Sequence, residues 1–247
     1  MMFADVLKPS CALFLDFDGT LVDIAAEPEQ VVVPPGLVDT LAAVRDLLGG
    51  ALAVVSGRPI AQIDGFLWPL QLPAAGEHGG ERRDSTGQLT LLPTLPLERV
   101  LEAAHMMAGQ HAGIRVEIKR GSVALHYRGA PEMAAACLGA MQAAVDLSPG
   151  LVLLRGKMVA EAKPGGIGKG QAIDSFMGEP PFRGRMPFFA GDDMTDEVGF
   201  ALVQGIGGMG IKVGEGSTTA WQRLPDPATL RRELEGALAL RAGRGPA

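Results

Sequence analysis

Short apolar runs and stretches of helical periodicity alternate in the first part of the chain. Residues 12–18 begin with an unbroken apolar run, as expected of a strand that is buried on both faces of a parallel sheet. Over residues 37–48, apolar side chains recur at helical spacing between a Pro-Pro pair and a Gly-Gly pair, which predicts a helix. The apolar run 51–55 predicts a second buried strand, so the pattern is strand, helix, strand.

The same alternation returns in the last third of the chain. Helices are predicted over 169–176, 195–203 and 227–241, and short apolar runs predict strands over 187–190 and 210–213. Strands separated by helices need crossover connections, which are right-handed in nearly all proteins and build a doubly wound parallel sheet. The two ends of the chain are therefore predicted to form one α/β core.

The middle of the chain has a different pattern. Helical spacing predicts helices over 97–110 and 131–147. Two short stretches, 114–118 and 122–127, alternate apolar and polar residues and are expected to pair as a hairpin, and residues 151–154 and 158–162 predict another strand pair. Such alternation buries one face of a sheet and leaves the other free, which is typical of an antiparallel sheet.

The predicted fold class is therefore α/β, with a doubly wound parallel-sheet core and an inserted α+β domain. The core is expected to comprise residues 1–82 and 165–247, and the insertion residues 83–164. A length of 247 residues suits one or two domains. Cys11 and Cys137 are isolated in the sequence and are expected to be ordinary buried thiols.

Composition and charge argue against several kinds of partner. The chain has 28 Asp and Glu against 22 Lys and Arg, a net charge of −6, whereas nucleic-acid-binding domains usually carry a basic patch. The longest uncharged stretch, 198–211, is shorter than the roughly 18 residues of a membrane span. The apolar run 11–15 is too short for a signal peptide. We expect a cytoplasmic protein that binds neither nucleic acid nor membrane; the oligomeric state stays open, with a monomer favoured.

Two acidic clusters follow predicted strands. Asp16 and Asp18 are two residues apart on an extended chain, so they point to the same side and repel each other unless a cation lies between them or one is protonated. A second cluster, 191–197, contains Asp192 and Asp193. Both strand ends are expected at one edge of a parallel sheet, where ligands of such folds bind, and carboxylate oxygens suit Mg²⁺. Helix N-caps would explain one Asp in each cluster, but not both.

Two further residues have a pattern suited to phosphate. Ser56 ends the second predicted strand, where its hydroxyl and nearby N–H groups could hold a phosphoryl oxygen, although a helix N-cap explains it as well. Lys169 lies at a predicted helix start, where a cation opposes the helix dipole and needs an anion nearby. The preceding Gly-rich segment is unlike a P-loop, since Gly170 stands where Ser or Thr is needed.

In this order, the two acidic clusters, Ser56 and Lys169 resemble the four motifs of the haloacid dehalogenase (HAD) superfamily of phosphotransferases. The finer resemblance is to the trehalose-6-phosphate phosphatases, and it covers about residues 12–240. Six segments carry it: 30–34, 56–58, 76–82, 124–128, 156–164 and 191–197. The resemblance implies a HAD-like core with an α+β cap that determines substrate specificity.

The same resemblance implies the reaction and its residues. A Mg²⁺-dependent phosphatase would hydrolyse trehalose 6-phosphate through an aspartyl phosphate on Asp16, with Asp18 as general acid and base. Mg²⁺ would be held by Asp16, the main-chain carbonyl of Asp18, and Asp192. Ser56 and Lys169 would bind the other phosphoryl oxygens. Two more acidic residues are expected to orient these groups or to bind the metal: Asp193 and Asp196.

Polar side chains of both domains are expected to bind the sugar phosphate. The candidates are Gly57, Arg58, His78 and Glu81 from the core, and His126, Arg128, Lys157, Glu161 and Lys163 from the cap. Three other functions stay open: a phosphatase of another sugar phosphate, such as sucrose or glucosylglycerol phosphate; a sugar phosphomutase or phosphotransferase, in which a sugar hydroxyl replaces water; and a non-catalytic sensor. The intact Asp16, Asp18, Lys169 and Asp192 argue against the sensor.

Overall fold

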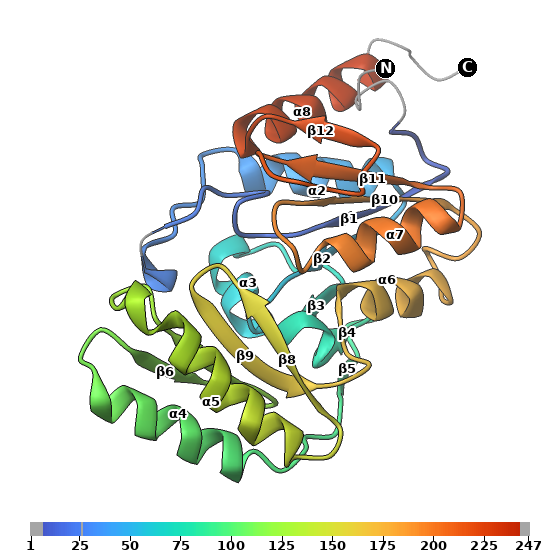
Figure 1. The fold of residues 1–247 in the computed structure, drawn as a ribbon. Helices are drawn as coiled ribbons and strands as arrows, with labels where there is room; N and C mark the ends of the chain where they lie inside the picture. Colours follow the sequence, from blue (N-terminus) through green and yellow to red (C-terminus); the bar gives the residue numbers. More distant parts are fainter. Residues whose placement is uncertain (1–6, 26, 243–247) are drawn as a thin grey trace. The chain divides into compact units, whose positions relative to one another are not determined.

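The computed structural model describes residues 7–25 and 27–242. The chain divides into two units, Met1–Leu91 with Gly168–Ala247, and Leu92–Ile167 (Figure 1). The second unit thus begins at Leu92, whereas the sequence pattern placed the start of the insertion at residue 83. The reason is that two short strands after residue 80, β4 and β5, still pair with the sheet of the first unit.

An eight-stranded sheet forms the centre of the first unit, in the order β12-β11-β10-β1-β2-β3-β4-β5. Neighbouring strands from β12 to β3 run parallel, and β4 and β5 are antiparallel additions at the edge. The strands are β1 (Cys11–Leu15), β2 (Leu52–Val55), β3 (Ala74–Gly76), β4 (Glu81–Arg83), β5 (Leu89–Leu91), β10 (Met186–Gly191), β11 (Met209–Val213) and β12 (Gln222–Leu224).

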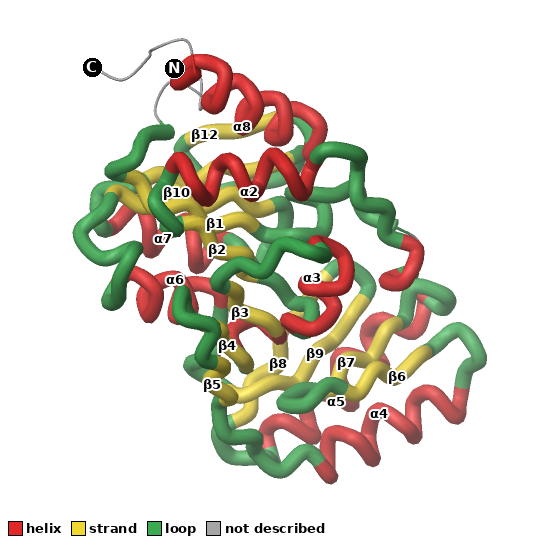
Figure 2. Tube along the Cα trace, turned by 180° about the vertical axis from the view of Figure 1, so that it is seen from behind, coloured by secondary structure: helices red, strands yellow, loops and turns green. Residues whose placement is uncertain are grey.

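Helices cover both faces of this sheet. α2 (Leu37–Leu47) and α8 (Pro227–Ala242) pack together on one face, and α6 (Lys169–Met177) and α7 (Glu197–Gly205) on the other (Figures 1 and 2). α3 (Ile60–Leu67) follows β2. This is the doubly wound α/β core predicted from the sequence. The described part of the chain also contains three short 3₁₀ helices: Pro28–Gln30, Glu77–Gly79 and Pro131–Met133.

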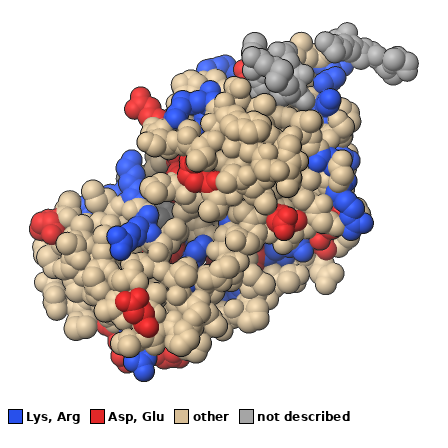
Figure 3. Space-filling view, turned by 45° about the vertical axis from the view of Figure 1, so that its right-hand side comes forward, with Lys and Arg blue, Asp and Glu red and all other residues tan. Residues whose placement is uncertain are grey.

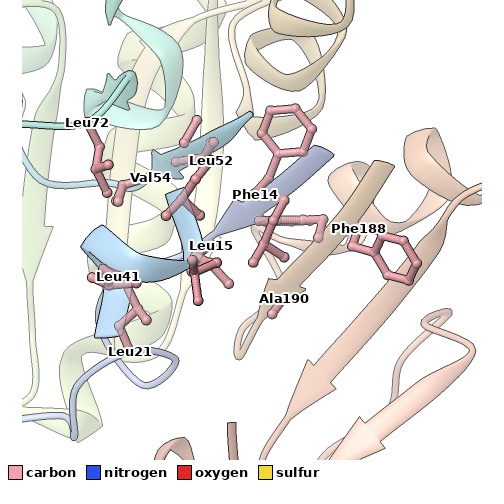
Figure 4. Close-up of a cluster of buried hydrophobic side chains, with 14 of the residues drawn as sticks. Phe14, Leu15, Leu21, Leu41, Leu52, Val54, Leu72, Phe188 and Ala190 are labelled. Atoms are coloured by element: carbon pink, nitrogen blue, oxygen red, sulfur yellow. The ribbon is translucent and has the colours of Figure 1, made fainter. Parts of the chain in front are cut away.

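The hydrophobic core explains why the central strands are continuous apolar runs. β1 lies between β2 and β10, and all five of its residues are fully buried. Figure 4 shows Phe14 of β1 among side chains of the neighbouring strands, including Leu52 and Phe188. Burying a side chain of this size contributes roughly 1.5–3 kcal/mol, so a polar residue inside these strands has to be offset by other interactions.

The second unit is an antiparallel sheet with two helices on one face. Its strands are ordered β6-β7-β9-β8, and α4 and α5 contact the sheet and each other. The elements are α4 (Glu98–Gln110), β6 (Arg115–Ile118), β7 (Val123–His126), α5 (Ala134–Asp146), β8 (Leu151–Gly156) and β9 (Val159–Pro164). Leu125 of β7 is buried with Met107 of α4 and Met141 of α5, as the alternating pattern predicts.

The charged surface, the cysteines and the helices can be compared with the expectations from the composition. On the face shown in Figure 3, basic and acidic side chains are interspersed among uncharged ones. Among the described residues, Cys11 and Cys137 are both buried thiols that form no disulfide, as predicted. Within the described residues, no helix is both long and apolar enough to cross a membrane.

Candidate active site

The C-terminal end of β1 leads directly into the first pair of carboxylates. Asp16 is 4% exposed, and its N–H donates to the carbonyl of Ala190 on β10 at 2.9 Å. After Asp18 the chain turns at Gly19, whose φ is +72°. A Cβ at Gly19 would lie 2.2 Å from Oδ2 of Asp192. The turn therefore brings the Asp192 carboxylate against the loop that carries Asp16 and Asp18.

Asp196 organises the second acidic cluster, at the end of β10. It is completely buried, and its Oδ2 accepts hydrogen bonds from the N–H groups of Asp192 at 2.9 Å and Asp193 at 3.0 Å. Its Oδ1 accepts a bond from Nζ of Lys169 at 2.7 Å. Asp193 is exposed and accepts two bonds from Thr195, at 2.7 Å from the N–H and 2.6 Å from the hydroxyl. The buried Asp196 carboxylate thus fixes the main chain of the loop that carries Asp192 and Asp193.

Lys169 joins the two clusters. It is the first residue of α6, is 3% exposed, and its Nζ lies 2.8 Å from Oδ1 of Asp16 as well as 2.7 Å from Asp196. Burial alone would lower the pKa of Lys169, but the charges of Asp16 and Asp196 raise it above its ordinary value. Two carboxylates therefore supply the anions that a lysine at a helix N-terminus requires.

The donor set suits a hard divalent cation. Carboxylate oxygens of Asp16, Asp192 and Asp196 lie within 4.8 Å of one another. Burial, followed by the charges of Asp193 and Asp196, raises the pKa of Asp192 to about 7 against the opposing charge of Lys169, so a further cation beside Asp192 would favour its ionised form. Three acidic oxygens at this spacing fit Mg²⁺. Because both oxygens of Asp196 already accept hydrogen bonds, Asp16 and Asp192 are the better candidate ligands.

Ser56 and Arg58 lie in the loop that follows β2. Ser56 is 1% exposed, and its hydroxyl oxygen accepts a bond from the Arg58 N–H at 3.1 Å. The Arg58 guanidinium donates to both oxygens of Asp18, at 2.6 Å from Nε and 2.8 Å from Nη2. It also lies over the rings of Phe17 and Phe66, 5.9 and 5.1 Å from their centroids. Arg58 thus contacts Asp18 directly.

The segment after β3 supports this loop through its main chain. The N–H of His78 donates to the Ser56 carbonyl at 2.9 Å, and that of Glu77 to the Arg58 carbonyl at 3.0 Å. Glu77 and His78 both have positive φ values, 49° and 56°, which cost energy for residues other than glycine. The His78 ring lies against Gly57, where a Cβ would be 2.7 Å from it. His78 is therefore placed beside the Ser56 loop.

Glu81 is engaged within the protein itself. Its Oε1 accepts a hydrogen bond from the N–H of Ile60, the first residue of α3. A Cβ at Gly76 would lie 2.5 Å from that oxygen, so glycine is required there for the contact. The geometry indicates that Glu81 fixes the start of α3, whereas the sequence suggested a contact with substrate.

The candidate residues of the second unit lie on its own sheet and turns. Glu161 is 5% exposed, and its Oε1 accepts bonds from the Ser122 hydroxyl at 2.6 Å and from Nζ of Lys119 at 3.3 Å. His126 forms a 2.8 Å bond with Glu117, which lowers the pKa of that carboxyl. The other three candidates are Lys163, which donates to the Ile167 carbonyl at 2.6 Å, and Arg128 and Lys157, which are exposed.

Sequence reasoning overlooked Lys119, Ser122 and Glu117. The strand register contained the signal, because Glu117 pairs with Ala124, and Ala124 with Glu161, across three neighbouring strands. Residues in direct register share one face of a sheet. Lys212, a buried residue beside the second acidic cluster, was also overlooked.

Comparison with known proteins identifies the family to which the chain belongs. Residues 14–226 match the family model described as trehalose-phosphatase. The chain is 42% identical over 220 residues to the trehalose-6-phosphate phosphatase of Escherichia coli strain K12, covering 88% of this chain and 83% of that protein.

Solved structures agree on the fold. The C-terminal domain of the Candida albicans trehalose-6-phosphate phosphatase superposes with a TM-score of 0.87 at 19% identity, covering 96% of this chain and 97% of that one. A phosphatase of the HAD superfamily from Bacteroides thetaiotaomicron superposes with a TM-score of 0.62 at 15% identity, covering 96% of both. The chain has the HAD fold and belongs to the trehalose-phosphatase family of phosphoric monoester hydrolases.

Proposed function

We propose that the protein is a Mg²⁺-dependent phosphatase that hydrolyses trehalose 6-phosphate, as a cytoplasmic step of trehalose biosynthesis. The observation that carries the chemistry is the buried ion pair between Asp16 and Lys169, 2.8 Å apart at the end of β1. Burial and the neighbouring carboxylates raise the pKa of Asp16 well above its ordinary value, and the Lys169 ammonium opposes this rise and favours the ionised form, which is the nucleophile. The name of the Escherichia coli relative supports the substrate.

In this mechanism Asp16 attacks the phosphorus, the bond from phosphorus to the sugar oxygen breaks, and an aspartyl phosphate forms. Asp18 protonates the departing sugar oxygen and then takes a proton from the water that hydrolyses the aspartyl phosphate. Ser56 and Lys169 bind phosphoryl oxygens. Because phosphoryl transfer depends mainly on positioning and charge stabilisation, each of these contacts affects the rate strongly.

Asp16 and Asp192, with the main-chain carbonyl of Asp18, would hold Mg²⁺. A bound Mg²⁺ supplies positive charge that lets the anionic substrate approach the anionic nucleophile. Asp196 acts by keeping Lys169 and the main chain of Asp192 in place, as its hydrogen bonds indicate. Asp193 is a further orienting residue in the same loop.

The second unit, corresponding to the expected cap, is proposed to select the sugar. Its polar residues His126, Glu161 and Lys163 lie on β7 and β9. Lys157 and Arg128 extend this set from neighbouring turns of the second unit. The substrate-binding residues proposed for the first unit are Gly57, Arg58 and His78. Glu81 is proposed to contribute indirectly, through its bond to the start of α3.

The substrate is tested by a panel assay. Phosphate release is measured for trehalose 6-phosphate, sucrose phosphate, glucosylglycerol phosphate and glucose 6-phosphate at saturating Mg²⁺. The proposal expects the highest kcat/KM for trehalose 6-phosphate. A higher kcat/KM for another member would reassign the substrate. Formation of a new sugar phosphate in place of inorganic phosphate would replace hydrolysis by transfer to a sugar hydroxyl, whereas ¹⁸O from labelled water in the released phosphate supports hydrolysis at phosphorus.

A further inference from the structure

Lys212 is a buried lysine beside the second acidic cluster. It lies on β11 in register with Gly191, the last residue of β10, and is 4% exposed. Its Nζ donates to two main-chain carbonyls, those of Asp192 and Val213, the latter at 2.7 Å. Burying an ammonium that bonds to carbonyls rather than to a carboxylate costs folding free energy. Its presence beside the acidic cluster therefore suggests that Lys212 has a role in the site.

The hydrogen bonds of Lys212 and Asp196 act on the same stretch of main chain. The carbonyl of Asp192 accepts from Lys212, and the N–H groups of Asp192 and Asp193 both donate to Oδ2 of Asp196. The peptide groups before and after the Cα of Asp192 are therefore both fixed. Fixing both peptides sets the direction of the Cα–Cβ bond, and with it the place of the Asp192 carboxylate against Gly19.

The surrounding charges show how the ammonium is tolerated. Burial would raise the pKa of Glu197, but hydrogen bonds from Thr219 and Thr218 and the positive charge of Lys212 keep it below its ordinary value. Glu197 thus provides a nearby negative charge. The Lys212 ammonium therefore has two kinds of partner. Its hydrogen bonds go to the carbonyls of Asp192 and Val213, and the negative charge of Glu197 provides longer-range electrostatic stabilisation.

We propose that Lys212 is a positioning residue for the metal ligand Asp192, fixing its main chain so that the site has high affinity for a divalent cation. This rests on the proposed Mg²⁺ site, although not on the identity of the sugar. Groups that orient metal ligands from outside typically change metal affinity about 10- to 100-fold when they are removed.

The direction in which the Kd for Mg²⁺ changes when Lys212 is replaced separates a positioning role from a purely electrostatic effect of its charge. Lys212→Met keeps a side chain of similar length and removes the charge and the donors. Removing a positive charge near a cation site would by itself tighten Mg²⁺ binding. Loss of positioning weakens it, and we expect a Kd for Mg²⁺ about tenfold or more higher than that of wild type.

Isothermal titration with Mg²⁺, in the absence of substrate, measures this Kd. The matched control is Lys8→Met, an exposed lysine of the same unit, which is expected to leave the Kd unchanged. Lys212→Arg retains a cationic donor and is expected to restore part of the affinity. Hydrogen–deuterium exchange should show faster exchange at amides 192 and 193 in Lys212→Met, because their bonds to Asp196 depend on the fixed loop.

A Kd for Lys212→Met equal to or below that of wild type overturns the proposal. If Lys212→Met does not fold, Lys212→Gln replaces it with the same expectation, and failure of both to fold assigns Lys212 to the stability of the fold and refutes the positioning role. Wild-type protein that does not bind Mg²⁺ would refute the proposed metal site together with this role. A normal wild-type Kd with an unaffected variant would refute only the role of Lys212.

Discussion

The contact between Gly19 and Asp192 predicts that one methyl group at residue 19 disables the site. In Gly19→Ala, the new Cβ would lie 2.2 Å from Oδ2 of Asp192, whereas ordinary contacts begin near 3.4 Å. The carboxylate must therefore move by about 1 Å, and misplacement on that scale can lower the rate roughly 100-fold. The positive φ of +72° adds a conformational cost of about 1–2 kcal/mol to the folded state.

Gly36→Ala is the matched control for this prediction. Gly36 has a φ of +83°, and a Cβ there meets nothing within 4 Å, so this variant has the same conformational cost without a clash. At about 2–4 °C per kcal/mol, both variants should lower Tm by roughly 2–8 °C in calorimetry. Only Gly19→Ala should lose kcat/KM for trehalose 6-phosphate. Equal activity of the two variants would refute the placement of Asp192 against Gly19.

Other substitutions separate the roles of the site residues. Asp16→Asn should abolish turnover, because a neutral amide is a poor nucleophile, and retention of about a tenth of wild-type kcat would exclude Asp16. Asp18→Asn should instead slow hydrolysis of the aspartyl phosphate, so that labelled phosphoenzyme accumulates in a quench experiment; a variant with normal turnover would remove Asp18 from acid–base catalysis. Glu161→Ala and Lys157→Ala should lower kcat/KM about 10- to 150-fold for trehalose 6-phosphate but not for a small aryl phosphate, whereas Lys169→Ala should impair both. Equal losses on both substrates, or none, for the first two would remove them from the sugar site.

Elements with a long periodic pattern or a continuous apolar run could be predicted from the sequence, and short elements with neither signal could not. α2 has enough turns for its apolar stripe to repeat, whereas α3 has eight residues and a glycine, Gly65, inside it. The spacing of Ile60, Ile63 and Leu67 was still a usable signal for α3. β3, β4 and β5 have three residues each, too few for an alternating pattern.

In the candidate site, features within one segment could be predicted from the sequence, whereas contacts between residues far apart along the chain could not. The sequence predicts that Asp16 and Asp18 share one site because they lie two residues apart after an apolar run, and in the structure both follow β1 directly. Their catalytic roles stay a prediction from the family resemblance. The bond between Arg58 and Asp18 joins residues 40 positions apart, and nothing in either segment indicates the other. Lys212 offered a signal that was not used: a charged residue in an otherwise apolar buried strand must find polar partners.

The proposed reaction can be tested by measuring phosphate release from trehalose 6-phosphate with Mg²⁺ and with excess chelator. We expect rapid release with Mg²⁺, loss of release in chelator, and recovery when Mg²⁺ is restored. Ca²⁺ should substitute poorly, because it takes 6–8 ligands at longer distances than Mg²⁺ and would misplace Asp16. Release at the full rate in excess chelator, or no release from this substrate with Mg²⁺ present, would contradict the proposed reaction.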